Sequence, residues 1–319
     1  MTPVLMMDGA LVEAPLEQDT LRVTLTDPAA AEPWLTRLLG SDVAVNVLAG
    51  STAVPRHPLL ARLALVLWAR RWWPASRLLR IPPLPGHLLA LEAAHLSAAL
   101  DGHLDPFEAT PQEWFDLAAA GALDWSGTRP ALEALATFFA EQDDERAATA
   151  ERLAAHATGV APGDFALAAG GPSAAVPAAA LASGSASVDW ALVPPGVLDA
   201  AENTVRWSLI PAGSGAALRV EVTALPGADA PVQAIATTAE HRLVIDLVPE
   251  PLTMVGEAPV PDGVAAAILD GRLDVVVTSP GADSAVTTVA ERAAVLAWVQ
   301  ARADQPQEEL LLAERSLGW

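Results

Sequence analysis

Three residue types are missing from the sequence, and each absence excludes a class of chemistry. The 319 residues contain no cysteine and no tyrosine, and all 18 basic residues are arginine, so lysine is absent as well. Without cysteine the chain has no disulfide, no thiolate nucleophile and no iron–sulfur ligands. Without lysine it has no P-loop lysine and no Schiff base. The arginine-only, alanine-rich composition indicates a GC-rich bacterial gene, and the lack of cysteine fits a reducing cytoplasm.

Long apolar runs are missing too. Residues 1–10 show no basic region followed by an apolar stretch, so we expect no signal peptide. The longest strongly apolar stretch, Leu63–Ala69, lies between Arg62 and Arg70 and is too short to cross a bilayer. The net charge of −21 disfavours binding to nucleic acids and to anionic membranes. We therefore expect a cytoplasmic protein that has neither kind of partner.

The N-terminal part of the sequence, residues 1–159, is predicted to be a helical bundle with a small β-α-β start. A helix is expected from Asp27 to Gly40, between extended segments at Leu21–Thr26 and Val43–Leu48 that would form a parallel pair. Further helices are expected at Leu59–Trp73, at Pro85–Leu100, after the capping box Thr110–Glu113, and from Thr128 to Gly159 with a break near Asp143.

Residues 160–187 differ in composition from the rest of the chain. Gly, Pro, Ser and Ala dominate, charge nearly vanishes and no apolar period persists, so this segment is predicted to be a linker between two modules. Beyond it the apolar period falls to two residues, which is typical of strands. Thr204–Ile210 and Ala217–Leu225 are expected to pair as a hairpin, with Arg206 opposite Glu221.

The second module, residues 188–303, is predicted to be an antiparallel β-sandwich of immunoglobulin-like or related type. Other strands are expected at Arg242–Val248, Arg272–Thr278, Val188–Val193, Val232–Thr238 and Leu252–Glu257. A short helix at Asp262–Leu269 interrupts the strands, and an amphipathic helix, Ala285–Ala303, closes the module. Residues 304–319 form a tail. The predicted fold class is therefore α+β with two modules.

Residues with metal-binding or catalytic potential do not form a complete motif. Glu92 and His95 have the spacing of half a di-iron site, but no second Glu-x-x-His follows. The segment Asp101–Asp105, which includes His103, lacks the spacing of a calcium loop or a zinc motif. Ser214 lies between two glycines at the expected hairpin tip, where such residues form turns. We therefore expect no catalytic residue, no bound metal and no cofactor.

One segment departs from the acidic background. Residues 43–91 contain six arginines, three interleaved tryptophans and no Asp or Glu. Arginine and tryptophan are enriched at the energetic centres of protein interfaces. The residues expected to bind a partner are Arg62, Trp68, Arg70, Arg71, Trp72, Trp73, Arg77, Arg80 and, in the tail, Trp319. The alternative is intramolecular, with the tryptophans in a core and the arginines paired with acidic residues such as Glu141–Glu145.

The tail Glu308–Trp319 allows two interpretations. Two acidic residues are followed by three leucines and, further on, by a tryptophan, which suits docking in the groove of a partner. The same residues are equally suited to folding back over the β-rich module.

The leading hypothesis for function is a non-catalytic scaffold, adaptor or regulatory subunit of a bacterial cytoplasmic assembly, binding an unidentified protein partner. Two alternatives stay open. An enzyme without a local signature would use histidines and carboxylates at the junction of the modules, and metal bound by His87, His95 or His103 would reveal it. A small-anion or nucleotide-binding protein would use the Arg56–Arg80 face.

Overall fold

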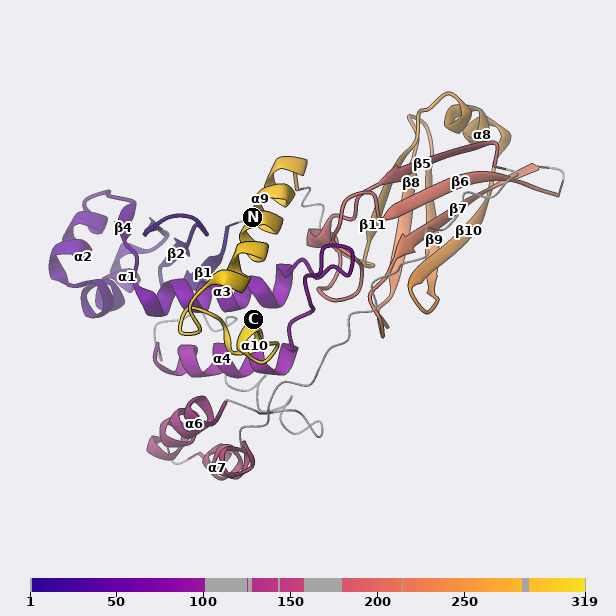
Figure 1. Ribbon diagram of the computed structural model, residues 1–319. Helices are drawn as coiled ribbons and strands as arrows, with labels where there is room; N and C mark the ends of the chain where they lie inside the picture. The colour runs from indigo at the N-terminus through magenta and orange to yellow at the C-terminus, as the bar shows by residue number, and fades with distance from the viewer. Residues whose placement is uncertain are drawn as a thin grey trace. The chain divides into compact units, whose positions relative to one another are not determined.

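The computed structural model describes residues 2–100, 125, 128–142, 144–157, 180–213, 215–282 and 287–318, which form helices and antiparallel sheets (Figure 1). Two compact units are present, and neither is continuous in sequence. The first comprises Met1–Arg70, Leu84–Asp164 and Ala301–Trp319, and the second comprises Arg71–Pro83 and Phe165–Gln300. The module limits expected from composition stay predictions, and the expected capping box at Thr110–Glu113 lies outside the described residues.

The first unit begins with a four-stranded antiparallel sheet in the order β1-β2-β3-β4. Its strands are β1 (Val4–Met7), β2 (Ala10–Glu13), β3 (Thr20–Leu25) and β4 (Ala53–Pro55). The predicted β-α-β start with a parallel pair was wrong, because Val43–Leu48 belongs to helix α2 (Ser41–Leu48). The buried residues of α2, Ala44 and Val47, are three positions apart, so the apolar period of this segment is helical.

Helix α1 (Pro28–Trp34) begins as the sequence predicts. The Asp27 carboxylate accepts hydrogen bonds from the backbone N–H groups of Ala29 and Ala30 at 3.0 and 3.4 Å. The helix continues as a π-helical turn, η1 (Leu35–Leu39), and ends at Gly40, which has a positive φ of 87°. The Trp34 indole donates to the carbonyl of Asp8 at 2.8 Å, so α1 is fixed against the β1–β2 turn.

The remaining helices of the first unit confirm the predicted helical segments wherever the chain is described. They are α3 (Pro58–Trp72), α4 (Gly86–Ala98), α6 (Arg129–Glu141) and α7 (Arg146–His156). The tail adds a short helix that was not predicted, α10 (Leu312–Arg315). The last two residues of α3, Arg71 and Trp72, belong to the second unit. Helix α4 is buried around most of its circumference and contacts both α6 and α10.

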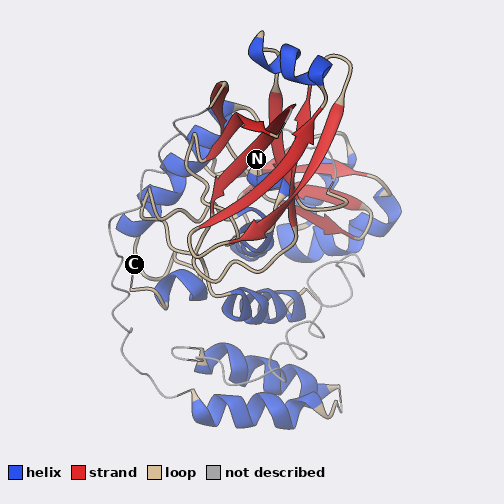
Figure 2. Cartoon of the chain, turned by 90° about the vertical axis from the view of Figure 1, so that its right-hand side faces the viewer, coloured by secondary structure: helices blue, strands red, loops and turns tan. Residues whose placement is uncertain are grey.

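The second unit is built on seven described strands in one antiparallel sheet, ordered β11-β8-β9-β10-β7-β6-β5, that curves into a nearly closed, barrel-like shape. The strands are β5 (Ala182–Ala186), β6 (Val205–Ala212), β7 (Gly215–Thr223), β8 (Val232–Thr237), β9 (Arg242–Pro249), β10 (Thr253–Val260) and β11 (Asp274–Thr278). Helix α8 (Asp262–Leu269) lies at one end of the sheet (Figure 2), and α9 (Val289–Ala301) follows the last strand. Both helices were predicted.

The predicted hairpin register is confirmed. Arg206 lies opposite Glu221, and Val205 and Leu209 lie opposite Val222 and Leu218. These four apolar residues are 0% exposed and belong to one core with buried side chains of β8 and β9. Apolar alternation on both strands therefore determined the pairing, since a slip by one residue would expose all four side chains.

Two expectations near the linker were wrong. Strand β5 lies inside the segment 160–187 that was predicted to be a linker, and residues 158–179 lie outside the described part of the chain. Small residues suit β5, because a Cβ on Gly184 would lie 2.5 Å from the Trp207 ring. Val188–Val193 is not a strand, because it contains a 3₁₀ turn, Trp190–Leu192, whose start is capped by Asp189.

The close approach of β10 to β9 is expected to make Gly256 sensitive to substitution. A Cβ at this position would lie 2.5 Å from the backbone oxygen of Asp246, so we expect Gly256→Ala to lower the free energy of unfolding by about 1–3 kcal/mol. Gly263, in helix α8, is the matched control. Apart from its chain neighbours and the backbone of its own helix, no atom lies within 4 Å of its added Cβ, and the alanine should raise stability by about 0.5–1 kcal/mol. Urea unfolding measures both, and equal effects would contradict the close approach.

Candidate functional site

The arginine- and tryptophan-rich segment is divided between the two units and between interior and surface. Trp68 and Trp73 are 2% exposed, so both are interior side chains. The Trp73 indole donates to the carbonyl of Pro82 at 2.9 Å. Arg56 donates to the backbone carbonyls of Pro15 and Gln18 within the first unit. Part of the expected Arg56–Arg80 face therefore serves local structure, and the face as a binding site stays a prediction.

The surface-exposed part of the segment is a tight turn that we call the arginine turn, Arg77–Arg80. It is closed by an antiparallel bridge between Ser76 and Ile81, with backbone hydrogen bonds of 2.7 and 2.8 Å. Arg80 has a positive φ of 59°, a left-handed conformation that an arginine adopts when the surrounding contacts require it. The bridge and the positive φ of Arg80 therefore define the backbone path of the turn.

The Asp199 carboxylate holds the arginine turn from the interior of the second unit. It accepts hydrogen bonds from the Ser76 hydroxyl at 2.6 Å and from the backbone N–H groups of Arg77 and Leu78 at 2.9 and 3.3 Å. A fourth bond comes from the N–H of Ala201 at 3.0 Å. Asp199 and Ser76 are both 0% exposed, so the contact is shielded from water and strengthened by its low-dielectric surroundings.

The arginine turn presents an apolar side chain between cationic ones. Leu78 is 56% exposed, Arg80 is exposed and Arg77 is half-buried. In the same segment of the second unit, the exposed Arg71 lies 4.8 Å from the centroid of the half-buried Trp72 ring. No Asp or Glu occurs between residues 71 and 83. This combination of residues can contact apolar and acidic groups of a partner, but it contains no nucleophile or general acid.

Sequence reasoning identified the arginines of the turn and missed both Leu78 and Asp199. The partners of Asp199 lie 121 to 123 residues away in sequence, so no local pattern indicates them. The Asp199 carboxylate also accepts a hydrogen bond from the N–H of Ala201, two residues later, in a local turn of the kind that aspartate favours. This turn is the only feature of the nearby sequence that could have indicated a structural role for Asp199.

The tail of the sequence is part of the first unit. Leu310, Leu311 and Ala313 are 0% exposed, and α10 contacts α4. The expected positions, in a partner's groove or over the β-rich module, are therefore not those seen for the described tail residues. We call residues 308–318 the strap. Trp319, an expected partner-binding residue, lies outside the described part of the chain.

Arg62 and Glu92 form the polar centre beneath the strap. Arg62 contacts the Glu92 carboxylate at 2.6 Å, and Glu92 is 2% exposed. Burial raises the pKa of Glu92 above its ordinary value, while the Arg62 charge and the Leu312 N–H act in the opposite direction. Burial and the charge of Arg62 lower the pKa of His95. The Glu92-x-x-His95 pair therefore lies beside a guanidinium group, which disfavours a cation at this position.

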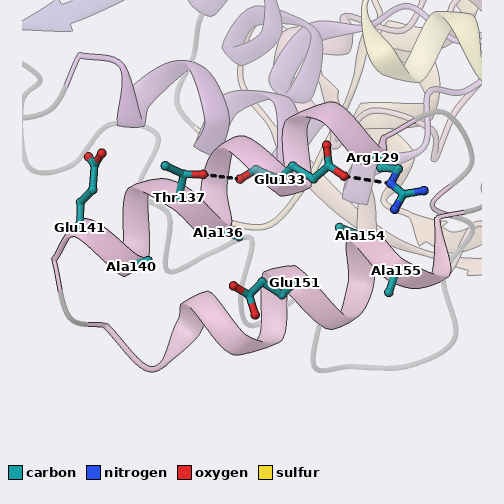
Figure 3. A pocket seen from close by; sticks show the side chains of 9 residues that line it. All are labelled: Arg129, Glu133, Ala136, Thr137, Ala140, Glu141, Glu151, Ala154 and Ala155. Atoms are coloured by element: carbon teal, nitrogen blue, oxygen red, sulfur yellow. Dashed lines mark hydrogen bonds and ion pairs between the residues drawn. The ribbon is translucent and has the colours of Figure 1, made fainter.

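A groove runs between α6 and α7 in the first unit (Figure 3), with a volume of about 610 Å³. Four alanines line it together with Arg129, Glu133, Thr137, Glu141 and Glu151. Arg129 is bound to Glu133 at 2.9 Å, and the Thr137 hydroxyl donates to the Glu133 carbonyl of its own helix. The side chains that line the groove are therefore mostly small or acidic, and none of them is an activated nucleophile.

Other candidate chemistry from the sequence is not brought together. Within the described ranges, no three His, Cys, Asp or Glu side chains are grouped as metal ligands would be. His87 packs edge-on against Trp125 with ring centroids 5.2 Å apart. The segment Asp101–Asp105 and Ser214 lie outside the described residues.

No family model, no curated protein and no solved structure matches this chain. Its geometry therefore carries the functional argument. None of the helices in the described parts of the chain is long and apolar enough to cross a membrane.

Proposed function

We propose that the protein is a non-catalytic scaffold, adaptor or regulatory subunit of a bacterial cytoplasmic assembly, and that it binds a protein partner through the arginine turn. The observation that carries the proposal is the fixing of the Arg77–Arg80 backbone by Asp199, which leaves Leu78 56% exposed. A binding loop that is already ordered loses less conformational entropy when it binds.

The chemistry of the turn favours a protein partner over a small anion. The phosphate groups of a small anion or a nucleotide would use the guanidinium groups and gain nothing from an exposed leucine. A protein surface with a shallow apolar depression surrounded by carboxylates would use both. The Arg71–Trp72 pair offers the two residue types most enriched at interface hot spots.

The finer description of the fold is part of this proposal. Strands β9 and β10 pair over only two residue pairs, so the sheet has two parts, β5-β6-β7-β10 and β9-β8-β11, whose buried residues share one core. This supports an immunoglobulin-like sandwich over residues 188–303 to which β5 adds an edge strand, together with a helix-rich module within residues 1–159. Such sandwiches present binding loops from a rigid sheet.

Charge reversal in the turn tests the proposal. The tagged full chain is used to recover partners from lysate of its native host, beside a variant carrying Arg77→Glu and Arg80→Glu. We expect recovery of the specific partner to fall at least tenfold, since truncating a hot-spot residue costs about 2 kcal/mol or more. Arg242→Glu, an exposed arginine of the same unit, is the matched control and should leave recovery unchanged.

Two outcomes contradict the proposal. One is a partner whose recovery is the same for both charge-reversed proteins and for the wild type. The other is a wild-type protein that is monomeric and recovers nothing above background. Thermal unfolding of each variant shows that a lost interaction does not reflect a lost fold.

A further inference from the structure

The strap is held in the first unit by side chains that bind its backbone. Arg62 donates to the carbonyl oxygens of Glu308 and Leu310 at 3.1 and 2.8 Å. Arg302 donates to the carbonyl oxygen of Glu309 at 3.1 Å. Three successive carbonyl groups are thus bound by guanidinium groups that lie outside the strap. Because every peptide carries these carbonyl groups, the contacts do not depend on the side chains of the strap.

The next residues of the strap add a donor and apolar anchors. The Glu92 carboxylate accepts a hydrogen bond from the backbone N–H of Leu312 at 2.7 Å. Leu310 and Leu311 are 0% exposed, as is Ala313, and Glu314 binds Arg302 through its carboxylate. The strap is therefore bound in the manner of a short peptide, extended at Leu311 and helical for one turn at Leu312–Arg315.

We propose that the α3–α4 surface around Arg62 and Glu92, together with Arg302, is a peptide-docking groove that the strap occupies as an exchangeable resident ligand. The groove takes in trans a peptide of the pattern Leu-Leu-x-Ala-Glu, and such a peptide binds when the strap leaves. This surface belongs to the first unit, and the inference does not depend on the arginine turn.

The residues that lead into the strap, 303–309, are all exposed, and α10 has only four residues. The strap thus depends on the groove for its order, because a single helical turn is not stable by itself in water.

A labelled synthetic peptide with the sequence of Pro306–Gly318 tests the proposal by fluorescence anisotropy. The receptor is the full chain with Leu310→Asp and Leu311→Asp, which expel its own strap. We expect this variant to bind the peptide at least tenfold more tightly than the wild type does. A peptide with the same two aspartates should not bind. Failure of a folded variant to bind, or equal binding of the aspartate peptide, would overturn the proposal.

If the double variant does not fold, hydrogen exchange of the wild-type protein tests whether the strap can leave the groove. We expect the backbone amides of Leu311 and Leu312 to exchange through a local opening that depends little on denaturant, while the buried amides of α4 exchange only on global unfolding. Exchange of all these amides in one global event would overturn the proposal, because a strap that never leaves alone cannot be replaced.

Discussion

Asp199→Ala is expected to lower the free energy of unfolding of the second unit by about 3–5 kcal/mol. The substitution removes the acceptor for four hydrogen bonds, from the Ser76 hydroxyl and from the N–H groups of Arg77, Leu78 and Ala201. Each buried donor left without an acceptor costs about 1–3 kcal/mol, and the bonds are stronger because the acceptor is a carboxylate. Urea unfolding, followed by tryptophan fluorescence and circular dichroism, measures the loss.

Asp270→Ala is the matched control for Asp199→Ala. The Asp270 side chain is 65% exposed and contacts the exposed Arg272, so its removal should change stability by less than about 0.5 kcal/mol. Asp199→Asn should be intermediate, because the amide oxygen keeps an acceptor while the amide nitrogen faces donors. If Asp199→Ala and Asp270→Ala had equal effects, the arginine turn would not be held in the way described.

The same variant links stability to the proposed function. At a temperature where Asp199→Ala is still folded, its arginine turn lacks the acceptor that fixes the backbone. Partner recovery should then fall although no arginine has changed. This outcome would show that the conformation of the turn, and not only its charge, is recognised.

The second large effect is expected at the buried pair Arg302–Glu314. Arg302 is 7% exposed and Glu314 is 0% exposed, and the Glu314 carboxylate also accepts from the N–H of Leu311 at 2.7 Å. Glu314→Ala leaves the guanidinium group buried without its counter-charge, so we expect a loss of about 3–5 kcal/mol. Arg302→Ala should cost a similar amount, because it leaves the carboxylate buried.

A double-mutant cycle measures the interaction directly. The variant with both alanines should be less destabilised than the sum of the two single variants, with a coupling energy of about 2–3 kcal/mol. The exposed pair Arg129–Glu133, at 58% exposure of each side chain, is the comparison and should couple by less than about 0.5 kcal/mol. Additive effects at Arg302 and Glu314 would show that the pair contributes only packing.

The sequence predicted elements well where two independent patterns agreed. In the β6–β7 hairpin, apolar alternation and the Arg206–Glu221 charge pair required the same register, and the structure has it. At α1, a capping aspartate and a proline at the first helical position gave the same helix start. Each such agreement removes alternatives that a single pattern leaves open.

Predictions were wrong where one residue type suits two conformations. Valines at alternate positions suggested a strand at Val43–Leu48, but the burial of Ala44 and Val47 on one helical face outweighed β propensity. The Ala-Ser-Gly-Ser-Ala sequence of β5 resembled a linker, because the reason for its small residues is the Trp207 ring on another strand. The Trp207 ring explains these small residues only once β5 and β6 are paired in the sheet, which the sequence around β5 does not show.

The candidate sites were predictable only in part, for the same reason. Composition indicated the arginines at positions 77 and 80, since they lie in a segment without acidic residues. The residues that give these arginines a fixed presentation, Asp199 and Ser76, are 123 positions apart. Arg62 and Glu92 bind strap residues that lie 220 to 248 positions away in sequence, so neither site has a local motif.

The strap also has a consequence for the synthesis of the protein. Leu312, whose N–H donates to the Glu92 carboxylate, is synthesised 220 residues after Glu92. At translation rates of about 5–20 residues per second, roughly 10–45 seconds pass before the groove can receive its own ligand. During this interval the apolar surface that later covers Leu310 and Leu311 is open on the nascent chain, so the first unit reaches its final form only when translation has passed residue 312.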